Sequence, residues 1–210
     1  MYNVSMRKIP REVYRCESRN DPVETTRQLL SNSMESELRM YILGALHDAT
    51  YSKKHKTFRF SQSSEGWLKI VQVIFSNLGQ KSWIYREGKD RFVWVLETSM
   101  KIDQDQKPAN NRDKIAYIRG YFDAEGGMPK NNNDFLYFQF SQKDYADLNQ
   151  LKSWLEDIGI KCGKIHNPSK KVDDNYWRFF VSRQSHRDFM ERIGSWHPRK
   201  MNQIEFRMKI

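Results

Sequence analysis

Apolar residues recur along this chain with two different periods. Helical spacing runs through residues 40–50, 65–78, 116–126 and 145–158, which predicts helices there. Alternation with a period of two predicts strands over 57–62, 82–87, 91–98, 136–142, 161–166 and 176–183. Helical patterns also cover 185–193 and 198–208, and an Asp-Pro-Val-Glu opening at residue 21 predicts a helix to about residue 30.

The predicted elements occur twice in the same order. Each copy has an apolar helix containing Asp-Ala, a strand containing Phe-Ser-Gln, an amphipathic helix and two more strands. Asp48 precedes Asp123 by 75 positions, and Phe60 precedes Phe140 by 80. Solenoids generally need three repeats or more, so two copies predict a closed pair of similar halves.

The repeat suggests how the chain is divided. Residues 1–35 form an N-terminal arm with an extra helix, 36–102 the first repeat, 103–111 a polar linker and 112–210 the second repeat.

Charge narrows the choice of partner. The 210 residues include 36 Lys and Arg against 26 Asp and Glu, giving a formal net charge of +10. Such a balance favours a polyanion, with nucleic acid first. Cys16 and Cys162 have neither disulfide-framework nor zinc-site spacing, and the apolar runs are too short to span a membrane. We expect a cytoplasmic protein, or an organellar or nucleoid-associated one in a eukaryote, that is not secreted and does not bind a membrane.

The two apolar helices carry small residues four positions apart, at Ala45 with Ala49 and at Gly120 with Ala124. Residues at i and i+4 share a helix face, so each helix offers a narrow seam where another backbone can approach. The duplication predicts that the two seams pack on each other.

The motifs on these helices, LGALHDAT at 43–50 and IRGYFDAEG at 118–126, resemble two copies of the LAGLIDADG motif. The chain is similar over about residues 36–205 to the single-chain, two-repeat LAGLIDADG homing endonucleases. The resemblance implies an α+β fold of two pseudo-symmetric αββαββ repeats, with saddle-shaped antiparallel sheets over a central pair of packed motif helices. It also implies a monomer that straddles double-stranded DNA and cleaves it with Mg²⁺, or with Mn²⁺ as the alternative.

The resemblance places a metal-binding acid at the foot of each motif helix. Glu125 fills this position in the second copy, whereas alignment on Asp-Ala puts Thr50 there in the first. Either Asp48 reaches the metal through a local distortion, or the first half contributes weakly and one strand is nicked, or cutting has been lost. Paired carboxylates at helix C-termini repel each other, and a divalent cation offsets that repulsion. Asp48 and Asp123 have a second interpretation, as helix-end residues that bond to nearby backbone.

The resemblance also implies a basic residue near the cut phosphate, and Lys200 is the candidate. Its alternative is a solvated lysine in the first turn of a terminal helix.

Strand alternation predicts which side chains contact DNA. Phe58, Phe60, Phe138 and Phe140 should face the helices, leaving Arg59 and Ser61, and Gln139 and Ser141, on the open faces. Arginine suits guanine and glutamine suits adenine in the major groove. The remaining candidates for base or phosphate contact lie on other predicted strands: Arg86, Arg91, Lys164, Arg178 and Arg183.

Two functions therefore compete. The first is a site-specific, Mg²⁺-dependent DNA endonuclease with one motif acid missing. The second is a cleavage-deficient DNA- or RNA-binding protein of the same fold, either maturase-like or regulatory.

Overall fold

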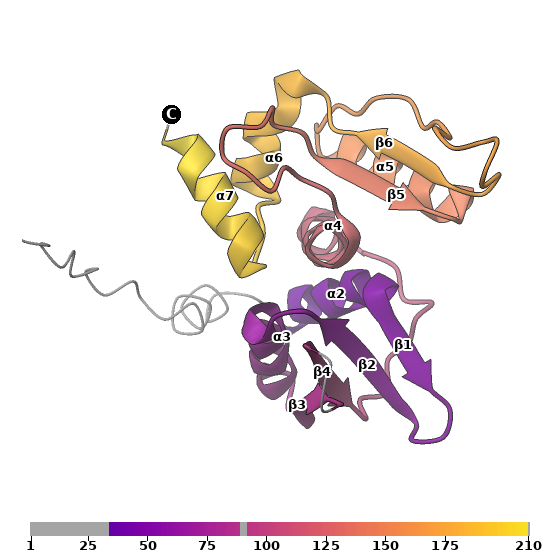
Figure 1. The fold of residues 1–210 in the computed structure, drawn as a ribbon, viewed down its shortest axis with the longest axis vertical. Coiled ribbons are helices and arrows are strands. Elements are labelled where there is room, and N and C mark those ends of the chain that lie inside the picture. The colour runs from indigo at the N-terminus through magenta and orange to yellow at the C-terminus, as the bar shows by residue number, and fades with distance from the viewer. Residues whose placement is uncertain (1–33, 89–91, 210) are drawn as a thin grey trace, which may run out of the picture.

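Two helices, α2 (Glu35–Ala45) and α4 (Asn111–Glu125), lie side by side at the centre and separate the strands into two groups (Figure 1). The computed structural model describes residues 34–88 and 92–209. The predicted N-terminal arm and its helix at 21–30 lie outside the described residues. Helix α4 begins within the predicted linker, because the side chain of Asn110 accepts hydrogen bonds from the backbone N–H groups of Arg112 and Asp113.

The first half contains a four-stranded antiparallel sheet in the order β1-β2-β4-β3. Its strands are β1 (Ala49–Ser52), β2 (Thr57–Gln62), β3 (Ser82–Glu87) and β4 (Val93–Thr98). Helix α3 (Glu65–Asn77) buries an apolar face that includes Trp67 and Phe75, in one cluster with Phe58 and Phe60. The prediction that these phenylalanines face the helices is confirmed, whereas strand β1 was not predicted.

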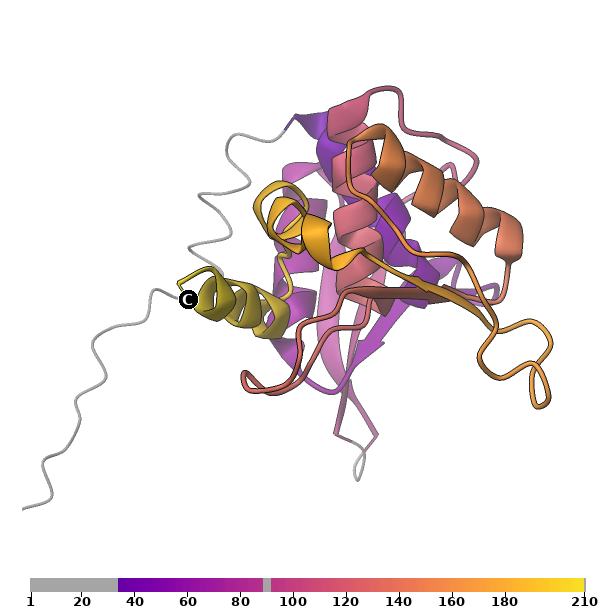
Figure 2. The same cartoon turned by 90° about the horizontal axis from the view of Figure 1, so that it is seen from above.

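The second half has the same order with less regular strands. Strand β5 (Gln139–Gln142) pairs with β6 (Trp177–Phe180), and helix α5 (Tyr145–Asp157) lies on one side of them (Figure 2). The outer strands are reduced to isolated bridges, Gly127 to Gln139 on one edge and Cys162 to Val181 and His166 to Arg178 on the other. The prediction of a continuous strand over 161–166 is thus wrong, because Cys162 and His166 form only isolated bridges there. The glycine at 163 contributes no side chain to the sheet, which weakens a strand at this point.

Two short helices complete the chain, α6 (His186–Arg192) and α7 (Pro198–Met208), close to the predicted ranges. The connection between them reaches the other half. Trp196, 6% exposed, belongs to the hydrophobic cluster of the first half, with its ring centroid 4.6 Å from that of Tyr41. The core of the first half is therefore completed by a residue near the C-terminus.

The contact between α2 and α4 depends on two glycines. A Cβ atom at Gly44 would lie 2.0 Å from the carbonyl oxygen of Tyr117, and one at Gly120 would lie 2.0 Å from that of Tyr41. The contacts are reciprocal, so the helices approach at equivalent points.

The seam prediction is corrected in part. Gly120 lies at the contact as predicted and faces the backbone of Tyr41 and Ala45, but the small residue of α2 that lies equally close to α4 is Gly44, which was not predicted. Ala49 is in strand β1, so it shares no helix face with Ala45, whereas Ala124 packs against the apolar cluster of the first half. The cause is the early end of α2, which tightens at Ala45 into the 3₁₀ helix η1 (Leu46–Asp48).

Among the helices of the described residues, none has the length and apolar character that crossing a membrane requires.

Candidate active site

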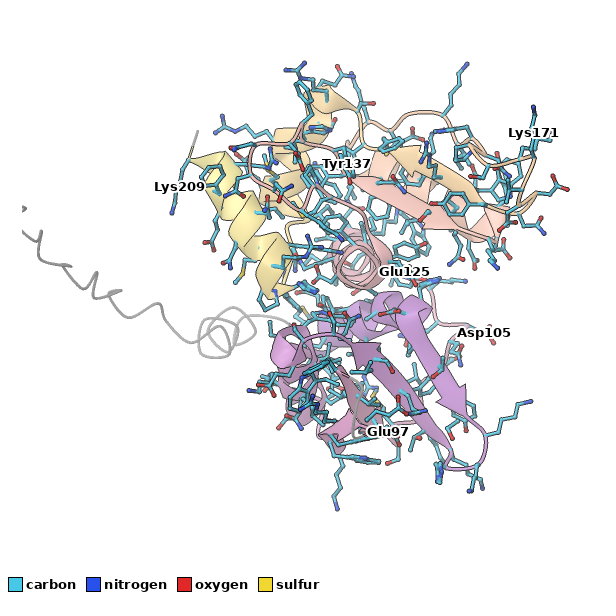
Figure 3. The ribbon with its side chains drawn as sticks, in the orientation of Figure 1. Glu97, Asp105, Glu125, Tyr137, Lys171 and Lys209 are labelled. Carbon is cyan, nitrogen blue, oxygen red and sulfur yellow. The ribbon has the colours of Figure 1, made fainter. Side chains whose placement is uncertain are left out.

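Two acidic residues meet where the central helices end. Asp48 is the last residue of η1, and Glu125 is the last residue of α4 and lies between the two halves (Figure 3). Burial and the nearby charge of Glu125 raise the pKa of Asp48 to about 6, against a hydrogen bond from Gln62 that lowers it. Burial also raises the pKa of Glu125, and Lys200 opposes that shift. The two carboxylates, one from each half, therefore interact electrostatically.

The 3₁₀ turn explains how Asp48 reaches this position. Asp48 follows Gly44 by four residues, whereas Glu125 follows Gly120 by five. A 3₁₀ helix rises about 2.0 Å per residue, against about 1.5 Å in an α-helix. Both acids thus lie roughly 7 to 7.5 Å along the axis from their glycine. Thr50, aligned with the acid by sequence, is exposed on strand β1 instead.

Lys200 is buried beside these acids, so its interpretation as a solvated surface lysine is wrong. The residue is 3% exposed, and its ammonium group donates to the backbone carbonyl oxygens of Phe122, of Asp123 at 3.2 Å and of Gly126 at 2.7 Å. It neutralises the carbonyl end of α4. Burial lowers the pKa of Lys200 to about 8, while the charges of Asp123, Glu125 and Asp48 oppose this.

Asp123 has a structural role. The side chain is 1% exposed and accepts hydrogen bonds from the hydroxyl groups of Tyr41 and Ser195 and from the backbone N–H of Trp196 at 2.8 Å. Burial raises its pKa. Asp123 therefore joins α4 to α2 and to the connection before α7; its partners are distant in sequence, not the nearby backbone that the second interpretation proposed.

Two glutamines at the site were missed in the sequence, although the repeated Phe-Ser-Gln marks them. Gln62 donates from Nε2 to Oδ2 of Asp48 at 2.6 Å. Gln142, its counterpart, lies 3.2 Å from Nδ1 of His47. Equivalent strand ends thus bring one amide to Asp48 and the other to its neighbour in the chain, His47.

The donor set fits Mg²⁺. This ion is usually held by one or two carboxylates together with waters and substrate phosphates. Within residues 34–88 and 92–209, no group of three His, Cys, Asp or Glu side chains could enclose a metal. Asp48 and Glu125 together supply the two carboxylates, and the charge of Glu125 contributes to the raised pKa of Asp48, a repulsion that a cation between them would relieve.

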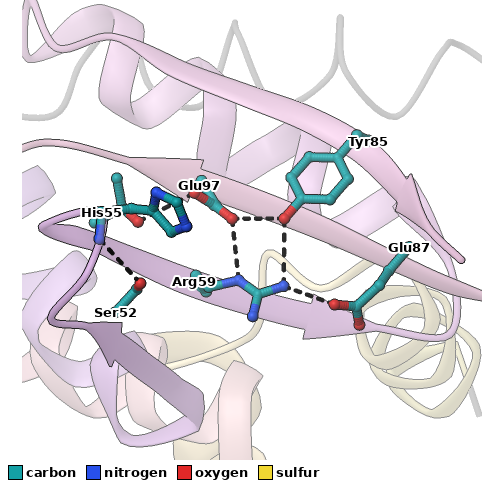
Figure 4. A network of polar contacts seen from close by, with 7 residues as sticks. Ser52, His55, Arg59, Tyr85, Glu87 and Glu97 are labelled. Atoms are coloured by element: carbon teal, nitrogen blue, oxygen red, sulfur yellow. Dashed lines mark hydrogen bonds and ion pairs between the residues drawn. The ribbon is translucent and has the colours of Figure 1, made fainter.

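On the face of the first sheet away from α3, Arg59 is held by other side chains (Figure 4). Its guanidinium pairs with Glu97 at 3.0 Å and with Glu87 at 2.9 Å, and it donates to the Tyr85 hydroxyl at 3.3 Å. Burial raises the pKa of Glu97, but hydrogen bonds from Tyr85 and Thr57 and the charge of Arg59 lower it by more, so that the net shift is downward. Arg59 lies on the predicted face, but as part of an ionic network.

Other candidates on the first half are placed differently. Ser61 is exposed on the same face as Arg59. Arg86 follows Tyr85 on strand β3, so it lies on the opposite face of the sheet from Arg59, the face on which Ile84 packs against the apolar cluster. Its guanidinium lies over the ring of Phe92, 4.7 Å from the centroid. Arg91 lies outside the described residues.

On the second half, three predicted residues share the face turned away from α5. Ser141 is the cross-strand partner of Arg178, and Gln139 is the partner of Phe180. Phe140 and Phe179 stack in the core with centroids 5.3 Å apart, which fixes the alternation. The exposed Lys164 lies between two isolated bridges, and Arg183 lies in the 3₁₀ helix η2 (Arg183–Ser185), beyond β6. The prediction that Arg183 ends a strand is wrong.

Comparison with known proteins agrees with this architecture. Residues 113–194 match the model of the LAGLIDADG-like domain. Homing endonuclease I-ApeI of Aeropyrum pernix is 26% identical over 194 residues, covering 78% of this chain and 85% of that protein.

Solved structures show the same fold. The structure of I-DmoI in complex with DNA and Mn covers 77% of this chain and 98% of its own, at 22% identity and a TM-score of 0.58. The N-terminal LAGLIDADG domain of DUF199/WhiA covers 85% of this chain and 92% of its own, at 16% identity and a TM-score of 0.63. The predicted α+β fold and the resemblance to LAGLIDADG homing endonucleases are confirmed.

Proposed function

Since this chain has the LAGLIDADG fold and its second half is a LAGLIDADG-like domain, we propose that it binds double-stranded DNA and hydrolyses its phosphodiester bonds at a specific site. The observation that carries the proposal is the position of Asp48 and Glu125 at the ends of η1 and α4, where the charge of Glu125 contributes to the raised pKa of Asp48. The similar I-ApeI is a homing endonuclease, and similar structures of I-DmoI contain DNA with Mn or Mg. Both acids belong to one chain, so the proposed enzyme acts as a monomer.

Asp48 and Glu125 would hold Mg²⁺ or Mn²⁺, which when bound polarises phosphate oxygens and lowers the pKa of water. The other residues prepare this position. Gln62 orients the carboxylate of Asp48, and Lys200 fixes the end of α4 on which Glu125 lies. The Gly44 and Gly120 contacts keep the two acids together, because any separation of the helices separates their ends.

A cleavage assay on double-stranded DNA tests the proposal. The DNA is a randomised library, the added ion is Mg²⁺ or Mn²⁺, and both strands are resolved. Glu125→Gln and Asp48→Asn should abolish cutting, whereas Glu65→Gln, an exposed residue paired with Lys69, should not. Nicking of one strand by Asp48→Asn would show that the first acid serves that strand alone. Retained cutting of both strands by Glu125→Gln would refute the assignment.

A second candidate is recognition without cleavage. It is favoured by the hydrogen bond from Gln62, which already occupies Oδ2 of Asp48. DNA or RNA binding that weakens steeply with salt, with no cutting by the wild type in either ion, would establish this alternative.

A further inference from the structure

The two sheets carry different types of side chain at equivalent cross-strand pairs. Arg59 is the cross-strand partner of Glu97 in the first sheet, and Gln139 is the partner of Phe180 in the second. Each pair is one residue from a buried aromatic, Phe60 or Phe140, that anchors the register. An ion pair on one sheet is therefore replaced by an amide beside an aromatic ring on the other.

Phe180 lies in an aromatic and basic cluster on the face turned away from α5. The centroid of its ring is 6.1 Å from that of Tyr137 and 6.3 Å from that of His166. The guanidinium of Arg178 lies 5.3 Å from the ring centroid. Phe180 and Gln139 are only partly buried, and Tyr137 is 38% exposed. The cluster thus offers apolar surface to a ligand next to one amide and one positive charge.

We propose that the two halves recognise their DNA half-sites by different chemistry, and that Phe180 selects thymine in the second half-site by contact with its 5-methyl group. The inference rests on the proposed DNA-binding function. Glutamine bonds to adenine in the major groove, whereas apolar side chains contact the methyl group of thymine. Adjacent Gln139 and Phe180 therefore suit the two bases of A·T pairs. At the equivalent point of the first sheet, Glu97 is charged and offers no apolar surface.

Replacement of thymine by deoxyuridine tests the inference, because it removes only the methyl group. The site bound by the full-length chain is selected from a randomised duplex library, and each half-site is then substituted separately. For wild type, substitution in one half-site should raise the Kd about fourfold per contacted base, as expected for a buried methyl group.

Variants identify the residue responsible. Phe180→Ala should weaken binding to the thymine duplex by a similar factor and abolish the deoxyuridine penalty in that half-site alone. Phe180→Leu should retain part of the penalty, because it retains apolar surface. Phe206→Ala, which removes a 40% exposed aromatic from α7, should leave both the Kd and the penalty unchanged. Equal urea midpoints for the two Phe180 variants and wild type would show that folding is not the cause.

The outcomes separate the inference from the proposed function. Tight duplex binding without a deoxyuridine penalty, or with a penalty that survives in Phe180→Ala, overturns the inference only. Preferential binding of RNA, which lacks the methyl group, also overturns it. No binding of duplex DNA would overturn both.

Discussion

Substitution of Gly44 by alanine tests the central contact between the two halves. The added Cβ atom would lie 2.0 Å from the carbonyl oxygen of Tyr117 and 2.7 Å from the backbone nitrogen of Tyr121, whereas ordinary contacts are 3.4–4 Å. Both neighbours are backbone atoms of α4, so no side-chain rotation can relieve the overlap. The two helices must move apart by about 1.4 Å at this point.

The expected free-energy change follows from two opposing effects. Alanine is about 1 kcal/mol better than glycine within a helix, which favours the variant. Overpacking costs typically about 1–3 kcal/mol and more against rigid neighbours, and a backbone contact lies at the upper end. We expect Gly44→Ala to be destabilised by a net 2 to 3 kcal/mol, roughly. Gly120→Ala should behave alike, because its Cβ atom would meet the carbonyl oxygen of Tyr41 at the same distance.

Urea unfolding provides the assay, with the midpoint compared at constant m-value. Gly66→Ala is the matched control, since its Cβ atom would meet only Pro198 Cγ, at 3.4 Å, and it should be neutral or slightly stabilising. The double variant of Gly44 and Gly120 should lose less than the sum of the single losses, because one separation of the helices accommodates both methyl groups. A Gly44→Ala protein as stable as wild type, or a strictly additive double variant, would refute the reasoning.

Three further predictions concern charged residues. With its pKa raised to about 6, Asp48 binds its proton more tightly in the folded than in the unfolded chain, so stability falls as pH rises from about 4 to 6. Without divalent ions, Asp48→Asn should exceed wild type in unfolding free energy at pH 7 by about 1 kcal/mol after allowance for partial exposure; equal stability would contradict this. The pKa of Lys200 is lowered to about 8, so the folded chain binds this proton less tightly than the unfolded chain, and stability rises with pH instead. Unfolding free energy should rise by about 2 kcal/mol from pH 8 to 9.5 in wild type but not in Lys200→Met, and matching pH profiles would reject this assignment. Arg59→Gln leaves Glu97 without its ion pair and should cost about 1–3 kcal/mol in urea unfolding. Adding Glu97→Gln should recover most of the lost free energy of unfolding, and a further decrease in that free energy would exclude the network.

The repeat in the sequence was sufficient for the architecture. Buried phenylalanines at alternate positions identified β2, and helical periodicity identified α3 and α5 to within a residue or two at each end. On one edge of the second sheet, alternation over 161–166 predicted a strand where the structure has two isolated bridges, and the single bridge of Gly127 on the other edge was not predicted, because one residue pair has no periodic pattern.

The site was predictable only in part. Sequence placed Glu125 at the end of its helix and kept Asp48 as one of three alternatives for the first half. The position of Asp48 near Glu125 depends on the 3₁₀ turn and could not be derived from the alignment, which assumes an equal rise per residue in both motifs. The burial of Lys200 depends on how α7 packs against the end of α4, and no local pattern encodes that contact.

The position of Trp196 has a consequence for synthesis on the ribosome. The first half emerges early, but its apolar cluster lacks this indole until residue 196 has been translated. Domains generally fold as units during synthesis, and exposed apolar surface on an incomplete unit promotes aggregation. The nascent first half therefore exposes an unfilled apolar site beside Tyr41 until Trp196 is available. We expect chaperones to bind chains that terminate before residue 196, because this site stays exposed in them.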